Sequence, residues 1–260
     1  MCQYTGKTSP CRQYTKSKPH PWGFKIWGRA SVSGILHDFE VYQGGDGKRT
    51  ELGQGADVVL KLTSTLQENW RYKIFGDNLF TSLPLISELN KKGMFYTGTV
   101  RTNRVPKCNL QNEKVLKRKG RGSYDSYEEE VNNVVAVRWY DNKAVTLLSS
   151  LTGVQPLAQA KRWDKPSKEH RFYNMPAIIQ SYNKNMGGID LLDSFLAKYR
   201  FAMKSRRWYL YLYWHFLMVA VINAWNVYRR DSRLLKLPKS EMLNTVEENS
   251  KLRLLTVSSL

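Results

Sequence analysis

Cysteine and acidic residues are both scarce in this 260-residue chain. The three cysteines, Cys2, Cys11 and Cys108, include no Cys-x-x-Cys pair and no regular Cys/His spacing, so we expect neither a disulfide framework nor a zinc module. Only 22 Asp and Glu oppose 41 Lys and Arg, which gives a formal net charge of +19. That charge favours a polyanionic partner, nucleic acid first and a membrane surface second. The N-terminus has no apolar signal stretch, so secretion has no support.

One long stretch has no charged residue at all. Residues 208–228 contain no Lys, Arg, Asp or Glu, and a run of this length is able to cross a bilayer. Three Trp and four Tyr are scattered along it, however, whereas membrane helices place these residues mainly at the two interfaces. We therefore expect a core helix that is covered on most sides, and no membrane partner.

Basic residues gather in three blocks: the arm before Asp38, residues 101–121 and residues 198–207. One such block is usually a solvated surface, but three with aromatic residues between them favour phosphate contacts. Pro106, Gly120 and Gly122 predict that the second block is an exposed loop without regular structure. The candidate DNA contacts are Arg101, Arg104, Lys117, Arg118, Lys119, Arg121, Lys204, Arg206 and Arg207.

The apolar pattern alternates between strand and helix periods along the chain. Strands are predicted at 24–27, 38–42, 72–75, 95–100, 131–140 and 144–149, with a hairpin through Ser33-Gly34 and a turn at Asp141-Asn142. Helices are predicted at 56–66 and 83–89, and they dominate from about residue 176. This order indicates a mixed α/β fold with a β-rich insertion and a helical C-terminal layer. We expect segments at 1–100, 101–170, 171–232 and 233–260.

Asp77 is the first carboxylate placed to carry chemistry. It directly follows a predicted strand, and the carboxyl ends of strands are where α/β proteins commonly build their sites. Asp is also common in turns at strand ends, so a purely structural role stays open.

Asp190 and Asp193 form the second candidate. They lie three residues apart, hence on one face of a predicted helix, just after a Gly187-Gly188 pair that we expect to loosen the chain. Both acids would complement the positive end of the helix dipole, and both would suit a metal ion. Residues 128–130, three Glu in a row, are expected to neutralise the basic loop and to have no catalytic role.

Six distinctive motifs follow one another along the chain. They are KPHPWGFK at 18–25, FGDNLFTS at 75–82, YTGTVR at 96–101, VRWYDNK at 137–143, YNKNMGGIDLLD at 182–193 and RRWY at 206–209. In this order they resemble the transposase domain of piggyBac-type elements and their domesticated relatives. The resemblance runs from about residue 4 to residue 232. It implies an RNase H-like mixed sheet whose site holds three Asp, with the second at Asp77, the third at Asp190, and Asp193 as a nearby acid.

The resemblance also implies chemistry and partners. Two Mg²⁺ ions, or Mn²⁺, would be held by the carboxylates and would serve in-line phosphoryl transfer on DNA. The implied partners are transposon ends and a TTAA target, and we expect a nuclear protein that forms a homodimer.

The chain departs from the pattern at the first Asp. In the family this Asp stands in an Asp-Glu pair shortly before a stretch that here resembles residues 3–7, yet no Asp precedes Asp38. We therefore expect transposase architecture with little or no strand-transfer activity. Three interpretations stay open: an active or formerly active nuclease, a non-catalytic DNA-binding derivative, and a fragment.

Overall fold

The computed structural model describes residues 2–6, 9–16, 20–44, 50–105, 108–130, 133–165, 167–199 and 204–238. The basic residues Lys7, Lys18, Lys107 and Arg200, the breaker Pro106 and the expected helical tail beyond residue 238 lie outside this set. The chain divides into two compact units, which we call unit 1 (Met1–Asp46 with Gly187–Leu260) and unit 2 (Gly47–Met186). Each is described by itself.

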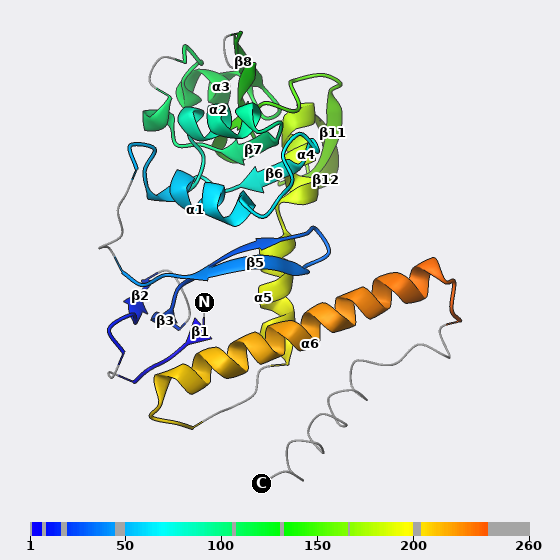
Figure 1. The fold of residues 1–260 in the computed structure, drawn as a ribbon. Coiled ribbons are helices and arrows are strands. Elements are labelled where there is room, and N and C mark those ends of the chain that lie inside the picture. The colour runs from blue at the N-terminus through cyan, green and yellow to red at the C-terminus, as the bar shows by residue number, and fades with distance from the viewer. Residues whose placement is uncertain are drawn as a thin grey trace. The chain divides into compact units, whose positions relative to one another are not determined.

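Unit 2 is built on a five-stranded sheet in the order β6-β7-β10-β9-β8 (Figure 1). Its strands are β6 (Lys73–Gly76), β7 (Phe95–Thr99), β8 (Tyr124–Glu129), β9 (Val134–Tyr140) and β10 (Ala144–Ser149). β6 and β7 run parallel, and the other neighbours are antiparallel. The expected mixed α/β fold is therefore confirmed, including the turn between β9 and β10.

Helices cover both faces of this sheet. On β9, Ala136 packs in one apolar cluster with Leu85 and Leu89 of α2 (Leu83–Lys91), whereas the next residue, Val137, packs in another with Ile178 of α4 (Ala177–Asn185). Successive strand residues point to opposite faces, so the two clusters lie on opposite sides of the sheet. α1 (Gln54–Thr63) contributes to the first cluster, together with α2.

The basic segment of unit 2 is more regular than expected. A short 3-10 helix, η1 (Thr102–Arg104), is followed by α3 (Glu113–Lys119), so the prediction of an irregular loop was wrong there. The Asn112 side chain accepts a hydrogen bond from the Val115 backbone N–H at 3.0 Å, and Gly120, with φ +95°, ends the helix. Leu116 anchors α3 from a fully buried position. A further hairpin, β11 (Ala158–Asp164) with β12 (Glu169–Met175), was also missed.

The described part of unit 1 holds two small sheets and two helices. The first sheet has the order β1-β3-β2, from β1 (Cys2–Gln3), β2 (Gln13–Tyr14) and β3 (Trp22–Phe24). The second is the antiparallel pair β4 (Ile26–Ala30) and β5 (Leu36–Val41), which confirms the hairpin predicted through Ser33-Gly34. The helices are α5 (Gly188–Lys198) and α6 (Trp208–Leu234).

An asparagine in the apolar run docks α6 on the β4-β5 hairpin. Asn223 donates its side-chain N–H to the Leu36 carbonyl at 2.8 Å and accepts from the Leu36 N–H at 2.9 Å. Its amide thereby replaces a neighbouring strand for this residue of β5. The polar residue inside the run is thus explained by a backbone partner.

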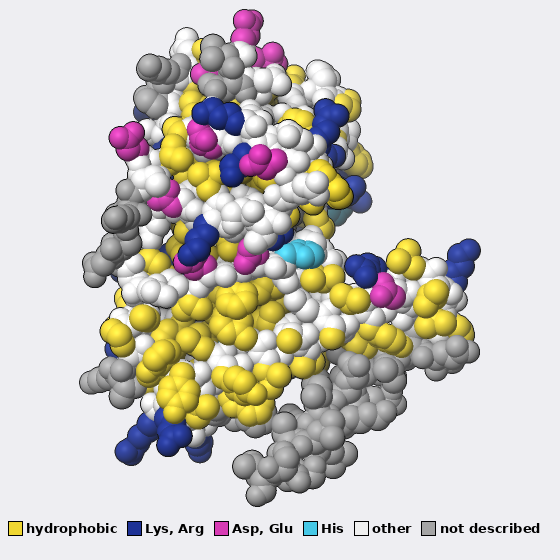
Figure 2. Space-filling view, viewed as in Figure 1, with side chains coloured by type: hydrophobic (Ala, Val, Ile, Leu, Met, Phe, Trp, Pro, Cys, Tyr) yellow, Lys and Arg dark blue, Asp and Glu magenta, His cyan; other side chains and the backbone are white. Residues whose placement is uncertain are grey.

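The prediction that this helix is covered on most sides was wrong. Among the described helices, α6 alone has the length and composition to cross a membrane, and only 22% of its most apolar 18-residue window is buried. Tyr209, Tyr213 and Leu217 are exposed, and Figure 2 shows hydrophobic side chains gathered along this helix. Contacts with α5, β1 and the β4-β5 hairpin leave these apolar side chains uncovered, whereas the sequence is apolar all round.

Candidate functional site

Asp77 follows directly after β6 and is held in a tight turn. Its carboxylate Oδ1 accepts a hydrogen bond from the Leu79 backbone N–H at 2.7 Å. Its carbonyl accepts from the Phe80 and Thr81 N–H groups at 3.2 Å and from the Thr81 hydroxyl at 2.9 Å. The Asp77 side chain is exposed to solvent. Its predicted position at the carboxyl end of a strand is confirmed, and the turn role considered beside it is also present.

A buried pair of hydroxyls supports this turn from below. The Thr81 hydroxyl lies 3.0 Å from the Tyr96 hydroxyl, and both residues are fully buried. Burial raises the pKa of Tyr96, so its phenol stays protonated and available as a hydrogen-bond donor. The turn that carries Asp77 is therefore tied to strand β7.

Two glycines of the recognised motifs make room for that hydroxyl pair. A Cβ at Gly76 would lie 2.2 Å from the Tyr96 hydroxyl, and a Cβ at Gly98 would lie 2.3 Å from the Thr81 hydroxyl. Neither distance is sterically possible without a shift in the β6-β7 pair. The glycines before Asp77 and within YTGT are thus explained by close packing beneath the turn.

Arg104, predicted as a DNA contact, holds the same turn from outside. Its guanidinium donates hydrogen bonds to the carbonyls of Asn78, Leu79 and Thr81 at 3.0, 3.0 and 3.1 Å. These carbonyls lie more than 20 residues away along the chain, and no spacing in the sequence indicated the contact. Arg104 therefore positions the backbone that follows Asp77.

Asp190 and Asp193 lie on α5 of unit 1. Asp190 is exposed in the first turn of this helix, and Asp193 is half-buried, while Leu192 on the other side is buried. The helix and the shared face of the two acids are confirmed.

The glycine pair before these acids does not loosen the chain as expected. Gly187 has open space around it, but a Cβ at Gly188 would lie 2.3 Å from the Ser31 carbonyl oxygen. Gly188 is buried as the first residue of α5, where it lets the helix approach the end of the β4-β5 hairpin. Close packing, not flexibility, explains this glycine.

Asp193 acts electrostatically on α6. Burial lowers the pKa of His215 to about 4, and the Asp193 carboxylate opposes that shift. His215 is therefore neutral at pH 7. The Asp193 carboxylate thus favours the charged form of a histidine on α6, a role that sequence spacing did not indicate.

Asp77, Asp190 and Asp193 carry the type of ligand that binds a divalent cation, but the described residues do not group three such ligands at one place. Carboxylate oxygens are the hard ligands that Mg²⁺ prefers. Within the described ranges, no three or more His, Cys, Asp or Glu side chains are grouped so as to hold a metal ion. Asp77 belongs to unit 2, and Asp190 and Asp193 belong to unit 1. Their convergence on one metal site stays a prediction.

The predicted DNA-contacting residues divide into two groups. An exposed group consists of Arg101, Lys117, Arg118, Lys119, Lys204, Arg206 and Arg207. Within it, the Lys119 ammonium donates to the Gln111 side chain at 2.7 Å. The exposed group includes the last turn of α3 and the segment that leads into α6.

The other group is Arg104, which is exposed but bonded to the turn after Asp77, and Arg121, which is half-buried. Arg121 binds groups within the protein. It forms an ion pair with Asp141, which Arg162 also contacts at 2.8 Å, and its guanidinium lies 5.2 Å from the centre of the Tyr173 ring. Partial burial opposes ionisation of Asp141, but hydrogen bonds from Arg162 and Arg121 outweigh it and lower the pKa of Asp141. Arg121 thus joins α3 to the β11-β12 hairpin.

Comparisons with known proteins agree with the resemblance that the six sequence motifs indicate. Residues 1–225 match the family described as Transposase IS4. Human PiggyBac transposable element-derived proteins 2 and 3 are each 33% identical over 233 residues, which is 88% of this chain and 39% of each relative. The chain thus spans about two fifths of the length of these curated relatives. A cryo-EM structure of a piggyBac transposase synaptic complex with hairpin DNA shares the fold, with a TM-score of 0.72 and 23% identity over 95% of this chain and 48% of that one.

Proposed function

Because this chain belongs to the Transposase IS4 family, we propose that it is the DNA-binding and carboxylate-bearing part of a piggyBac-type DDE transposase. The observation that carries the proposal is the exposed Asp77 on a turn fixed from both sides, by the Thr81–Tyr96 hydroxyl pair and by Arg104. A site that must bind a metal ion and DNA phosphate needs its carboxylate accessible and its backbone rigid.

The parallel pair β6-β7 with α2 between its strands supports the proposal of an RNase H-like core. Asp77 lies at the carboxyl end of β6, and α2 begins six residues later at Leu83. Asp190, with Asp193 one turn further along α5, is the proposed companion. In this family a divalent cation supplies stabilisation of the attacking and leaving oxygens during phosphoryl transfer.

The chain's own residues account for binding and positioning. The exposed cations of α3 and of the segment before α6 would neutralise DNA phosphates. The Leu79 N–H keeps the Asp77 carboxylate in place, and the Arg104 guanidinium donates hydrogen bonds to the carbonyls of the same turn. Transposon ends, a TTAA target, a homodimer and nuclear location belong to this proposal.

DNA binding is tested by fluorescence anisotropy with a labelled 30-base-pair duplex at increasing salt. Contacts with several phosphates predict that the affinity falls at least tenfold between 50 and 200 mM salt. An affinity that hardly changes over this range would argue against binding through phosphates.

DNA cleavage is tested in a second experiment. Two assigned Asp are fewer than the three that the resemblance implies, so we propose that these 260 residues alone bind DNA and leave it uncut. The protein is incubated with Mg²⁺ or Mn²⁺ and DNA that carries transposon ends. We expect no nicks in this DNA, either with the parent protein or with the Asp77→Asn variant. Efficient nicking that Asp77→Asn abolishes would instead establish the active nuclease interpretation.

A further inference from the structure

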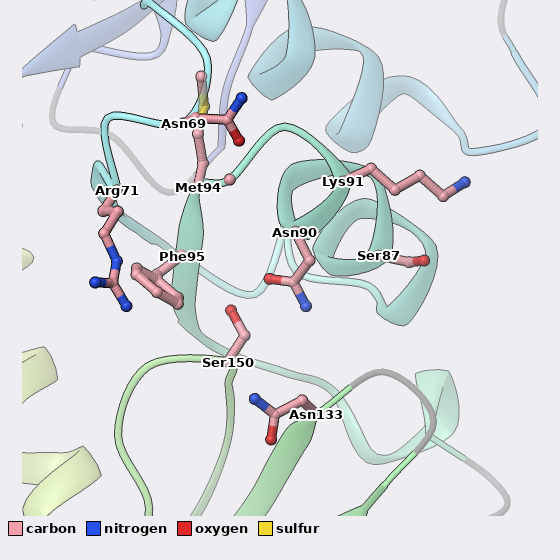
Figure 3. Close-up of a pocket in the computed structure, with 10 residues that line it drawn as sticks. Asn69, Arg71, Ser87, Asn90, Lys91, Met94, Phe95, Asn133 and Ser150 are labelled. Carbon is pink, nitrogen blue, oxygen red and sulfur yellow. The ribbon is translucent and has the colours of Figure 1, made fainter.

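A cavity of about 630 Å³ lies in unit 2, among residues that no part of the proposed function uses. It is formed by the loop before β6, the last turn of α2, the start of β7 and the ends of β9 and β10 (Figure 3). Its volume falls in the range typical of small-ligand sites. The lining residues are Asn69, Arg71, Ser87, Asn90, Lys91, Gly93, Met94, Phe95, Asn133 and Ser150.

Five of the ten described lining residues carry an amide or a hydroxyl. Asn69, Asn90 and Asn133 each carry an amide, which has donor and acceptor groups, and Asn90 extends toward Ser150 in Figure 3. Among the described lining residues there is no carboxylate, and the Lys91 ammonium pairs at 2.6 Å with Glu88, which is not one of them. Such a site suits a ligand whose edge carries both donors and acceptors, as nucleic-acid bases do.

A cation and an aromatic ring complete the arrangement. The Arg71 guanidinium lies 5.6 Å from the centre of the Phe95 ring. Figure 3 shows both side chains across the cavity from Asn90 and Asn133. An aromatic ring provides a stacking surface for an unpaired base, and an arginine provides a phosphate contact.

The backbone around the cavity is held in unusual conformations. Asn69, Arg71 and Asn133 have φ values of +63°, +56° and +50°, so three of the five described non-glycine residues with positive φ line this one cavity. Gly93 permits the arrangement, because a Cβ there would lie 2.5 Å from the Asn69 side-chain oxygen. Strained backbone of this kind is concentrated at functional sites.

We infer that this cavity binds one unpaired nucleotide of a DNA strand, with the base among the amides and its phosphate at Arg71. The inference rests on the proposed DNA binding and adds a subsite to it. A nucleotide outside a duplex exposes the base edges and ring faces that the cavity can contact, whereas a paired nucleotide hides them.

The test compares two labelled duplexes, one fully paired and one with a single unpaired 2-aminopurine nucleotide. The protein should bind the second at least fivefold more tightly and should change the 2-aminopurine fluorescence on binding. Binding of both duplexes with equal affinity and no fluorescence change would overturn the subsite and leave the proposed DNA binding intact. Failure to bind either duplex would overturn both.

Two variants locate the subsite. Asn133→Asp keeps a residue that tolerates positive φ and places a negative charge in the cavity, so the preference for the unpaired nucleotide should disappear while duplex affinity changes less than twofold. Asn142→Asp, on the exposed β9-β10 turn, makes the same change of charge elsewhere and should keep the preference.

Arg71→Gly removes the guanidinium at a φ that glycine adopts freely, so this variant should fold at least as well as the parent. It should also lose the preference for the unpaired nucleotide. A preference that survives both Asn133→Asp and Arg71→Gly would show that the nucleotide binds elsewhere.

Discussion

At the scale of single residues, charge alone does not say what an arginine does. Arg104 and Arg121 were both predicted to contact DNA from their place in a basic block, yet one binds three carbonyls beside Asp77 and the other pairs with Asp141. A guanidinium has five donors in a fixed plane, so it can join segments that are distant in sequence. The partners of these side chains exist only in the folded chain.

Arg104→Ala should loosen the turn after Asp77. Loss of its hydrogen bonds to three carbonyls should lower the free energy of unfolding by about 1 kcal/mol, a modest effect because the side chain is exposed. Hydrogen exchange at the Leu79, Phe80 and Thr81 amides should rise more than this global change explains. Arg101→Ala, a neighbouring exposed arginine, serves as the control, and equal exchange in both variants would contradict the positioning role.

Asp141→Asn should show a pH-dependent loss of stability. The folded-state pKa of Asp141 is below its ordinary value, so its ion pairs stabilise the fold above about pH 4, the unfolded pKa, and this benefit is lost as the pH falls through the folded value. Urea unfolding should give a deficit of about 2 kcal/mol at pH 7 and a smaller one at pH 3. Glu128→Gln, an exposed change of the same kind, should give little at either pH; a deficit equal at both would refute the ion-pair explanation.

At the scale of elements, the apolar pattern of the sequence predicted the helices and strands of the core and missed those whose side chains are mostly polar and exposed. α2 was predicted because it buries a helical set of apolar residues, Leu85, Ile86 and Leu89. β6, β7 and the β9-β10 hairpin were predicted because they are short runs rich in apolar, aromatic or β-branched residues. β11 and β12 were missed because most of their side chains are exposed and several are charged. α3 was missed because Leu116 is its only buried residue and its N-terminal cap comes from Asn112.

The site was predictable in part for the same reason. Motif positions gave Asp77, Asp190 and Asp193, since a strand end and a helix start are visible in sequence. The Thr81–Tyr96 pair and the Arg104 contacts were not, because they join side chains from separate elements. The amide-lined cavity was equally hidden, since its walls come from five segments of unit 2.

Substitutions in the glycine pair before Asp190 distinguish a role in flexibility from a role in close packing. Gly188→Ala would force a Cβ against the Ser31 carbonyl and should destabilise the protein by about 2 kcal/mol. Gly187→Ala enters open space at φ −82° and should be neutral or slightly stabilising. Urea unfolding of both variants measures the difference, and equal losses would mean that the pair acts through flexibility after all.

At the scale of the whole molecule, a net charge of +19 predicts binding to a polyanion but does not identify the surface that binds. Seven of the nine cations predicted to contact DNA form the exposed group, most of them on α3 and before α6, while Arg104 and Arg121 bind groups within the protein. Other exposed cations, such as Lys143 and Lys161, lie elsewhere. The structure therefore identifies which of the predicted side chains are accessible to DNA phosphates, which the net charge alone does not.

The double change Arg118→Ala with Lys119→Ala tests α3 as a phosphate-binding surface. Each phosphate contact contributes close to one unit to the slope of log affinity against log salt, so two lost contacts should reduce that slope by about 1 to 2. The pair Lys143→Ala with Lys161→Ala removes the same charge from other exposed positions and should leave the slope nearer its original value. Affinity measured across 50 to 200 mM salt distinguishes the two. If both pairs reduce the slope equally, binding depends on the overall charge of the protein and not on α3.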